Sequence, residues 1–255
     1  DFLGRFRQEQ FMKVVKKTMK NADALFTICD SMNQAYHQLF QRNCYTLHTP
    51  AVNMEIAMKE DARQISYIGN VGCGRVQSLL EIGQALAELD SEELPGYIDV
   101  YSGTKQPEYI DQLSQAPGIR FHGAISTEQV LDVMRHSMAV VHAESFDRNM
   151  MERVRFSVST KIAESLMYGP CLLAYGPEGI ASIDYLKENH AAYVISSMQK
   201  LKTGLQEFLK NTDLRNEILK DARFLAQKNH DGTRNPENVR RWLSEIAAPG
   251  KEADV

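Results

Sequence analysis

The stretch VVHAESFDRNMMERVRFSVSTKIAESLMYG, residues 140–169, decides the fold of this chain. A short apolar run ends in a polar turn at residues 144–147, and the segment after Ser159 has the composition of a helix. The pattern predicts a buried strand, a loop and a helix whose first turn carries hydroxyls and a cation. Unpaired backbone N–H groups and the helix dipole favour an anion at such a helix start, so we expect a phosphorylated ligand there.

Strands and helices alternate on both sides of this stretch. Ser126 and Gln129 form a capping-box pattern before one of the helices. The alternation predicts an α/β fold, a Rossmann-like parallel sheet flanked by helices, with ligands beyond the carboxyl ends of the strands. Strands are expected at 65–68, 98–101, 119–122, 138–142, 171–174 and 192–195, and helices at 76–89, near 109, and at 127–135, 160–168 and 180–187.

The two ends of the chain have simpler patterns. The first part predicts an amphipathic helix at 6–19, a strand at 24–28, a helix at 31–40 and a strand at 44–48. The tail, 198–247, predicts three helices. We expect the helix that contains Trp242 to pack against the first helix, because each would cover apolar surface on the other.

Composition narrows the class of protein. A net charge of -4 gives no electrostatic reason to expect nucleic acid as a partner. The four cysteines are widely spaced, which indicates free thiols in a reducing compartment and no metal site. No apolar run approaches the length of a membrane span, so we expect a cytoplasmic protein. The chain starts without Met directly in a helical pattern, and we expect it to be a truncated piece of a longer protein.

Polar residues at the expected strand ends are the candidates for chemistry. The loop GNVGCGR, residues 69–75, has a GxxGxG order rather than the dinucleotide GxGxxG, and Arg75 is either a phosphate contact or surface charge. Glu144 at a strand end is either functional or merely solvated. Lys161 and Glu164 share a helix face, where they would meet phosphate and hydroxyls or form an ordinary surface ion pair. The convergence of these residues on one edge of the sheet favours the functional interpretation.

These motifs resemble the donor-binding half of retaining GT-B glycosyltransferases of the group 1, family 4-like type. The family has a first-strand Gly followed by a basic residue, matched here by Gly69 and Arg75. It also has a Glu-Gly-Phe-Gly-like turn and a Glu-Ala-Met-Ala-x-Gly-x-Pro-Val helix and strand, to which ESFD at 144–147 and ESLMYGPCL at 164–172 are similar. Residues 22–31 resemble the closing segment of the family's acceptor-binding half.

The chain departs from the family at two places. Its two glutamates, Glu144 and Glu164, are separated by an insertion that carries Arg148, Arg153 and Arg155. Asn70 stands where an arginine commonly follows the glycine, so one phosphate contact is either missing or supplied by the insertion.

The resemblance implies a role for each matched residue. Glu164 would hold the ribose, and Glu144 would act as the catalytic residue near the transferred sugar. It implies no metal and no cofactor, with a nucleotide-diphosphate sugar, such as a UDP-sugar, as substrate. The diphosphate would be held by Arg75, Lys161, Gly69, Ser159 and Thr160, the donor sugar by the backbone of Ser145, Phe146 and Asp147, and the base by Gly123 and Ala124.

The implied protein is a hexosyltransferase-type enzyme of bacterial surface polysaccharide or glycolipid synthesis. Its expected domains are a remnant of the acceptor domain and linker at 1–52, the donor-binding domain at 53–230, and a C-terminal helix at 231–255 that returns to the N-terminal segment. The acceptor, a glycan or glycolipid, would bind through the missing domain. The intact protein would be cytoplasmic and could contact the inner face of a membrane. Two alternatives stay open: a nucleotide-sugar epimerase of the same architecture, and a non-catalytic binding or scaffolding module.

Overall fold

The computed structural model describes residues 2–52, 54, 56–57, 59, 62–89 and 94–248, with the backbone alone for residues 2–6 and 8. The chain forms two compact units. Unit 2 comprises residues 50–231, and unit 1 comprises residues 1–49 together with the segment from Gly232 onward. Within the described residues, no helix combines the length and apolarity that a membrane crossing requires.

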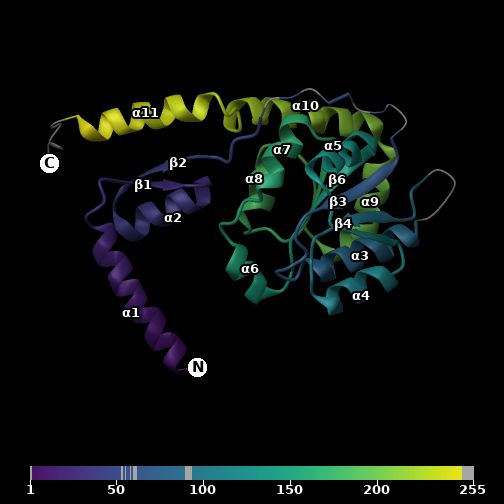
Figure 1. The fold of residues 1–255 in the computed structure, drawn as a ribbon, viewed down its shortest axis with the longest axis horizontal. Coiled ribbons are helices and arrows are strands. Elements are labelled where there is room, and N and C mark those ends of the chain that lie inside the picture. Colours follow the sequence, from purple (N-terminus) through teal and green to yellow (C-terminus); the bar gives the residue numbers. More distant parts are fainter. Residues whose placement is uncertain are drawn as a thin grey trace. The chain divides into compact units, whose positions relative to one another are not determined.

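Unit 2 contains a six-stranded, all-parallel sheet in the order β5-β4-β3-β6-β7-β8. Figure 1 labels its strands β6, β3 and β4. The prediction of a Rossmann-like sheet flanked by helices is confirmed. The chain builds outward from β3 to β5 and then restarts at β6 on the other side of β3. Such a reversal leaves a crevice at the carboxyl ends of the two central strands. The strands are β3 (Gln64–Ile68), β4 (Ile98–Tyr101), β5 (Ile119–Gly123), β6 (Ser137–Ala143), β7 (Cys171–Tyr175) and β8 (Tyr193–Ile195).

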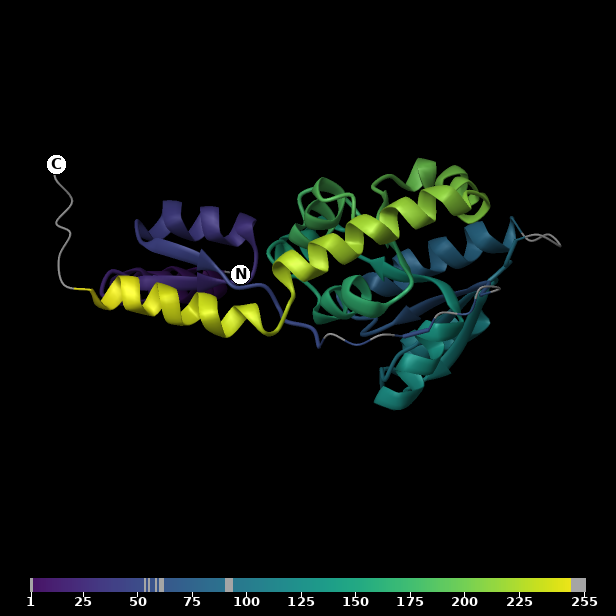
Figure 2. The same ribbon diagram turned by 90° about the horizontal axis from the view of Figure 1, so that it is seen from above.

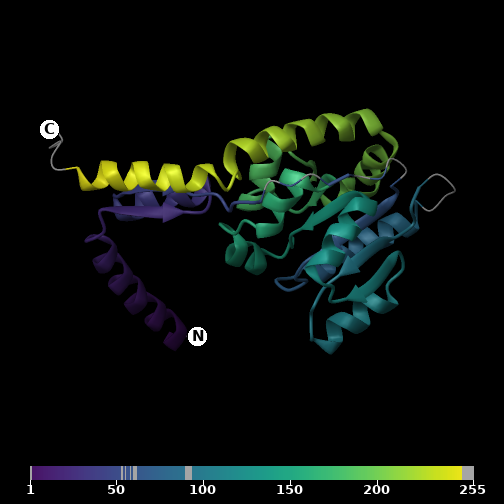
Figure 3. The ribbon, with the colours of Figure 1, turned by 45° about the horizontal axis from the view of Figure 1, so that its top comes forward.

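Helices cover both faces of this sheet, because successive strand side chains point to opposite faces and both sets are apolar. In β6, Val141 belongs to the core on one face and Val140 to the core on the other. Figure 3 shows α10 and α4 on opposite sides of the sheet. The first face carries α3 (Arg75–Ala87), α4 (Pro107–Gln115) and α9 (Leu201–Lys210), and the second carries α5 (Thr127–His136), α7 (Thr160–Tyr168), α8 (Ala181–Glu188) and α10 (Thr212–Asn229).

Local signals placed most of these elements correctly. The capping box before α5 is present: the Ser126 hydroxyl accepts from the Gln129 backbone N–H, and the Gln129 side chain accepts from the Ser126 N–H. The predicted helices of the tail are present as α9, α10 and α11 (Arg234–Ala247), after a 3-10 turn at Met198–Lys200. A further helix, α6 (Arg148–Val154), lies in the insertion and was not predicted, because seven residues are too few to show a helical period.

Unit 1 is built on two parallel strands, β1 (Ala24–Thr27) and β2 (Asn43–Thr46), joined by α2 (Asp30–Phe40). Figure 2 shows α2 and α11 on opposite faces of these strands. The Trp242 ring of α11 lies 6.0 Å from the ring of Phe26 and 5.1 Å from that of Tyr45. The strands therefore supply the aromatic surface that α11 covers.

The expectation that α11 packs against α1 (Phe2–Met19) is wrong. Phe11 and Val14, on the expected contact face of α1, remain 66% and 63% exposed. Trp242 instead packs on the rings of Phe26 and Tyr45 in the two strands.

Candidate functional site

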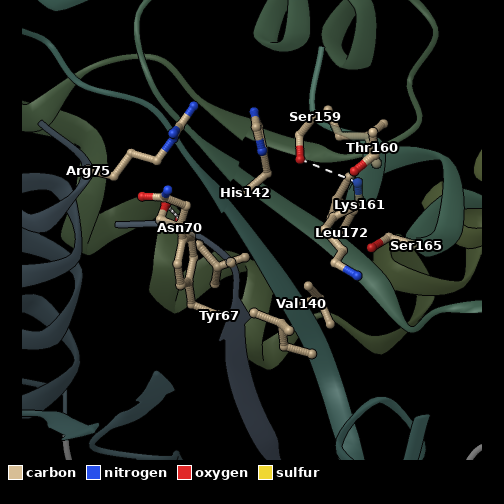
Figure 4. A pocket seen from close by; sticks show the side chains of 14 residues that line it. Tyr67, Asn70, Arg75, Val140, His142, Ser159, Thr160, Lys161, Ser165 and Leu172 are labelled. Atoms are coloured by element: carbon tan, nitrogen blue, oxygen red, sulfur yellow. Dashed lines mark hydrogen bonds between the residues drawn. The ribbon is translucent and has the colours of Figure 1, made fainter. Parts of the chain in front are cut away.

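A cavity of about 350 Å³ opens at the carboxyl ends of β3 and β6, where the strand order reverses. Figure 4 shows Arg75 on one side of it, Ser159, Thr160 and Lys161 on the other, and His142 between them. These side chains come from α3, from the start of α7 and from β6. Three segments that are distant in sequence therefore meet around one hollow.

The glycine-rich loop after β3 delivers Arg75 to this cavity. The Asn70 carboxamide accepts a hydrogen bond from the Gly72 N–H at 2.6 Å, which closes a tight turn. Gly74 has φ +78, and a Cβ at this position would lie 2.5 Å from the Ser145 hydroxyl oxygen. The loop can approach the β6 loop this closely only because residue 74 is a glycine. Asn70 thus shapes the turn.

A buried ion pair holds the Arg75 side chain. Its Nη2 donates to Glu144 Oε1 at 2.8 Å, and its Nε donates to the Ala143 carbonyl at 3.1 Å. Burial raises the pKa of Glu144, and the ion pair with Arg75 opposes that rise. For Arg75, burial lowers the pKa, but the hydrogen bond and charge of Glu144 raise it more, so the guanidinium stays charged. The Nη1 amino group has no partner within the described residues and is available to a ligand.

Glu144, expected near the transferred sugar, is not among the residues that line the cavity. Its side chain is 1% exposed and lies beneath Arg75. Its Oε2 atom is buried without a hydrogen-bond partner in the described part of the chain. Glu144 is therefore placed to orient Arg75 rather than to contact a ligand directly.

His142 is a cavity residue that the sequence analysis did not single out. Its Nε2 lies 3.0 Å from Ser182 Oγ and 3.5 Å from Glu144 Oε1. Burial and the nearby Arg75 charge lower the pKa of His142 to about 3, so the imidazole is neutral at physiological pH. The only sequence signal for His142 was a polar residue within the otherwise apolar run at residues 138–143.

The start of α7 forms the opposite wall. Ser159 is the N-cap and accepts from the Lys161 N–H at 3.3 Å. Lys161 Nζ lies 3.0 Å from Glu164 Oε2, and these side chains are 42% and 34% exposed. A pair this exposed and three positions apart on a helix is worth only about 0.2–0.5 kcal/mol. An anion in the cavity can therefore draw Lys161 away from Glu164 at little cost.

A second cavity, of about 330 Å³, adjoins the first, since Gly69 and Lys161 line both. Glu164 lies in its wall, together with Ala124 and Ile125 after β5. Ile68, Val130 and Leu131 make much of its surface apolar. The two cavities together place two cations, one carboxylate and an apolar hollow along a continuous path.

The predicted site residues divide into two groups. Those that the structure brings to the two cavities are Gly69, Arg75, Ala124, Ser159, Thr160, Lys161 and Glu164. The turn after β6 does not line either cavity: the Phe146 ring packs 5.0 Å from Tyr175, and the Asp147 carboxylate caps α6 by accepting from the N–H groups of residues 149 and 150. Ser145 is buried, and Gly123 ends β5 at φ +74 outside both linings.

The arginines of the insertion also lie outside both cavity linings. Arg148 is 92% exposed and lies 3.9 Å from Glu152 on the same helix. Arg155 stacks over the neighbouring Phe156 ring. The second cation of the site is Lys161, not a residue of the insertion.

Comparison with known proteins gives a family. Residues 83–240, more than half of the chain, match the model of the family described as glycosyl transferase-like. No curated protein matches the sequence.

Solved structures share the fold at low sequence identity. A crystal structure of TarM has a TM-score of 0.71 at 12% identity, covering 93% of this chain and 46% of TarM. Sucrose-phosphate synthase from Thermosynechococcus elongatus has a TM-score of 0.66 at 14% identity, covering 93% and 62%. HepE from Anabaena, solved with UDP and glucose, has a TM-score of 0.67 at 11% identity, covering 91% and 66%.

The chain thus spans between about half and two thirds of the length of these structures. All of them are below 15% identity and share only the fold. The match over residues 83–240 shows more, and the chain belongs to the glycosyl transferase-like family.

Proposed function

We propose that unit 2 binds a nucleoside-diphosphate sugar and serves as the donor-binding part of a retaining glycosyltransferase. The observation that carries the proposal is the meeting of Arg75 and Lys161 from different segments on one cavity, which continues past Lys161 to Glu164. Cations at short range stabilise a diphosphate, and a nearby carboxylate can accept hydrogen bonds from the hydroxyls of a ribose. The acceptor of the sugar, a glycan or glycolipid, would be held by residues beyond this chain.

The two cations have different tasks in this proposal. Arg75 is held in place by Glu144 and the Ala143 carbonyl, so it offers a preorganised N–H group to the phosphate nearer the sugar. Lys161 moves from Glu164 to the diphosphate when the donor binds. This exchange frees the Glu164 carboxylate to accept hydrogen bonds from the ribose. Nucleotide binding and formation of the ribose contact are thereby coupled.

The chemistry follows from these contacts. When the bond between the anomeric carbon and the phosphate oxygen breaks, negative charge grows on the leaving diphosphate and positive charge on the sugar ring. Arg75, Lys161 and the N-terminal end of α7 stabilise the leaving group. Glu144 positions the Arg75 guanidinium, because its buried side chain forms an ion pair with Arg75. The sugar keeps its anomeric configuration in the proposed reaction.

The base would occupy the second cavity, against the chain that follows β4 and β5. The apolar wall of Ile68, Val130 and Leu131 suits the face of a planar ring. We propose UDP as the nucleotide portion. The support is the solved structure of HepE, a protein of the same fold, with UDP and glucose.

Calorimetric titration of the chain with UDP, GDP and ADP tests the proposal. We expect UDP to bind and Lys161→Ala to weaken it about 10- to 100-fold, as for a lost hydrogen bond between charged groups. Lys187→Ala is the matched control, because Lys187 is also a half-exposed helical lysine paired with a glutamate but lies outside both cavities. Absence of heat with every nucleoside diphosphate would overturn the proposal.

The ribose contact has its own test. Glu164→Ala should weaken UDP about tenfold and leave the affinity for 2′,3′-dideoxyuridine diphosphate unchanged, because that nucleotide lacks the hydroxyls that Glu164 would hold. An equal loss for both nucleotides would show that Glu164 acts through Lys161 and not on the ribose.

A further inference from the structure

His142 has one ring nitrogen engaged inside the protein and one that is not. Nε2 faces Ser182 Oγ at 3.0 Å and Glu144 Oε1 at 3.5 Å. Nδ1 has no hydrogen-bond partner within the described residues. The ring is almost wholly buried, with 9% of the side chain exposed, and it lies in the wall of the first cavity between Arg75 and Ser159 (Figure 4).

The neighbours of Nε2 determine the tautomer. A carboxylate oxygen attracts a proton on the facing ring nitrogen, and the Ser182 hydroxyl oxygen can accept from it. Burial raises the pKa of Glu144, whereas the hydrogen bond and the charge of Arg75 favour its carboxylate form. These two neighbours favour the tautomer with the proton on Nε2, which leaves a lone pair on Nδ1.

A nitrogen lone pair in the cavity wall discriminates between the phosphate and the hydroxyl groups of a sugar nucleotide. It repels a phosphate oxygen, which is also an acceptor, and it accepts a hydrogen bond from a hydroxyl. Phosphate has its own partners in Arg75 and Lys161. With the ribose hydroxyls assigned to Glu164, a hydroxyl of the sugar is the remaining group of a nucleoside-diphosphate sugar that can donate to this lone pair.

We infer that His142 is a sugar-contacting residue whose Nδ1 accepts a hydrogen bond from a hydroxyl of the transferred sugar, with Ser182 and Glu144 fixing its tautomer. The inference rests on the proposed function and deepens it. Through its Oε1 atom, Glu144 then orients both the Arg75 guanidinium and the His142 ring. A low pKa, caused by burial and the Arg75 charge, keeps the ring an acceptor over the working pH range.

Two substitutions distinguish the contribution of Nδ1 of His142 from that of Nε2. The amide of His142→Gln reaches the position of Nε2 and keeps the internal contacts, but it leaves nothing at Nδ1. The amide of His142→Asn reaches the position of Nδ1 and keeps an acceptor toward the cavity. His190→Gln is the control, since His190 is exposed and outside both cavity linings. Circular dichroism spectra and melting curves establish that each variant is folded.

The probes are UDP, UDP-glucose, UDP-N-acetylglucosamine and GDP-mannose, titrated into the whole chain by calorimetry. For the sugar nucleotide that the wild type binds, His142→Gln should lower the affinity about tenfold, the loss of one hydrogen bond, and His142→Asn should restore part of it. The affinity for the free nucleoside diphosphate should change less than twofold. Equal losses for the sugar nucleotide and the free diphosphate, or no loss for either, would overturn the inference.

Failure of the proposed function gives a different result: the wild type then binds no nucleotide at all. A second measurement does not depend on the variants folding. In ¹⁵N NMR spectra of the wild type, the His142 signals should show a proton on Nε2, and the Nδ1 signal should move with a sugar nucleotide but not with the free diphosphate. A proton on Nδ1 would overturn the inference whatever ligand binds.

Discussion

Removal of the Glu144 side chain should destabilise unit 2 by leaving a buried charge without its partner. In Glu144→Ala, the Arg75 guanidinium loses the 2.8 Å hydrogen bond from Nη2. It cannot turn freely into water, because its side chain is only 16% exposed and its Nε still donates to the Ala143 carbonyl. Breaking one side of such a pair costs far more than the net worth of the pair.

The expected magnitude is about 3 kcal/mol, the lower end of the range for breaking a buried ion pair. The lower end applies because Arg75 keeps its second hydrogen bond and some exposure. For a unit of this size, about 3 kcal/mol corresponds to a fall in Tm of roughly 6–12 °C. Exposed pairs give much less, so Glu152→Ala in the exposed pair with Arg148 should change stability by under about 0.5 kcal/mol.

Urea and thermal unfolding followed by far-ultraviolet circular dichroism measure the loss. Fluorescence follows unit 1 separately, since the single tryptophan, Trp242, lies there. The double variant Arg75→Met, Glu144→Leu should be more stable than Glu144→Ala, because it removes both charges and fills the space with apolar atoms. A loss of less than about 0.5 kcal/mol in Glu144→Ala, or no recovery in the double variant, would refute this reasoning.

Three further outcomes are expected. Gly74→Ala should destabilise the chain by more than Gly179→Ala, because both positions have positive φ but only at position 74 does an added Cβ meet a side chain, the Ser145 hydroxyl at 2.5 Å; equal losses in urea unfolding would contradict this. Burial lowers the pKa of His142 to about 3, so the imidazole stays neutral in the folded protein, whereas the unfolded chain takes up a proton below about pH 6.5. Lowering the pH from about 6.5 to 3 should therefore reduce the stability of the folded protein. The wild type should therefore lose about 3 kcal/mol more stability than His142→Gln between pH 7.5 and pH 4.5. An equal stability difference between the two proteins at both pH values would exclude this role. Trp242→Ala should lower the stability of unit 1 by about 1–3 kcal/mol through the loss of two ring contacts, measured by hydrogen exchange of β1 and β2, and unchanged exchange would show that the contacts contribute nothing.

The path of the backbone could be predicted because its signals are local. The helix Thr160–Tyr168 and the strand Ile98–Tyr101 lie where their apolar patterns and flanking residues place them. The capping box at Ser126 works within four consecutive residues. A parallel sheet with helices on both faces then follows from the alternation of such elements.

The candidate site could be predicted only in part. Arg75, Lys161 and Glu164 stood out as charged residues at expected strand ends and helix starts, and the structure brings them to two adjoining cavities. Glu144 had the same kind of signal but lies below the surface. A charge at a strand end is recognisable from sequence, whereas its exposure is decided by what packs above it.

The sequence by itself therefore determined the order of the elements, the sheet type and the residues able to carry charge to its carboxyl edge. Only the tertiary structure decided that Glu144 pairs with Arg75, that His142 lines a cavity, and that Trp242 contacts two strand rings. The physical reason is the difference in sequence separation over which the interactions act. Backbone periodicity and capping act over a few residues, but burial and ion pairing depend on side chains that only the strand order brings within a few ångströms of each other.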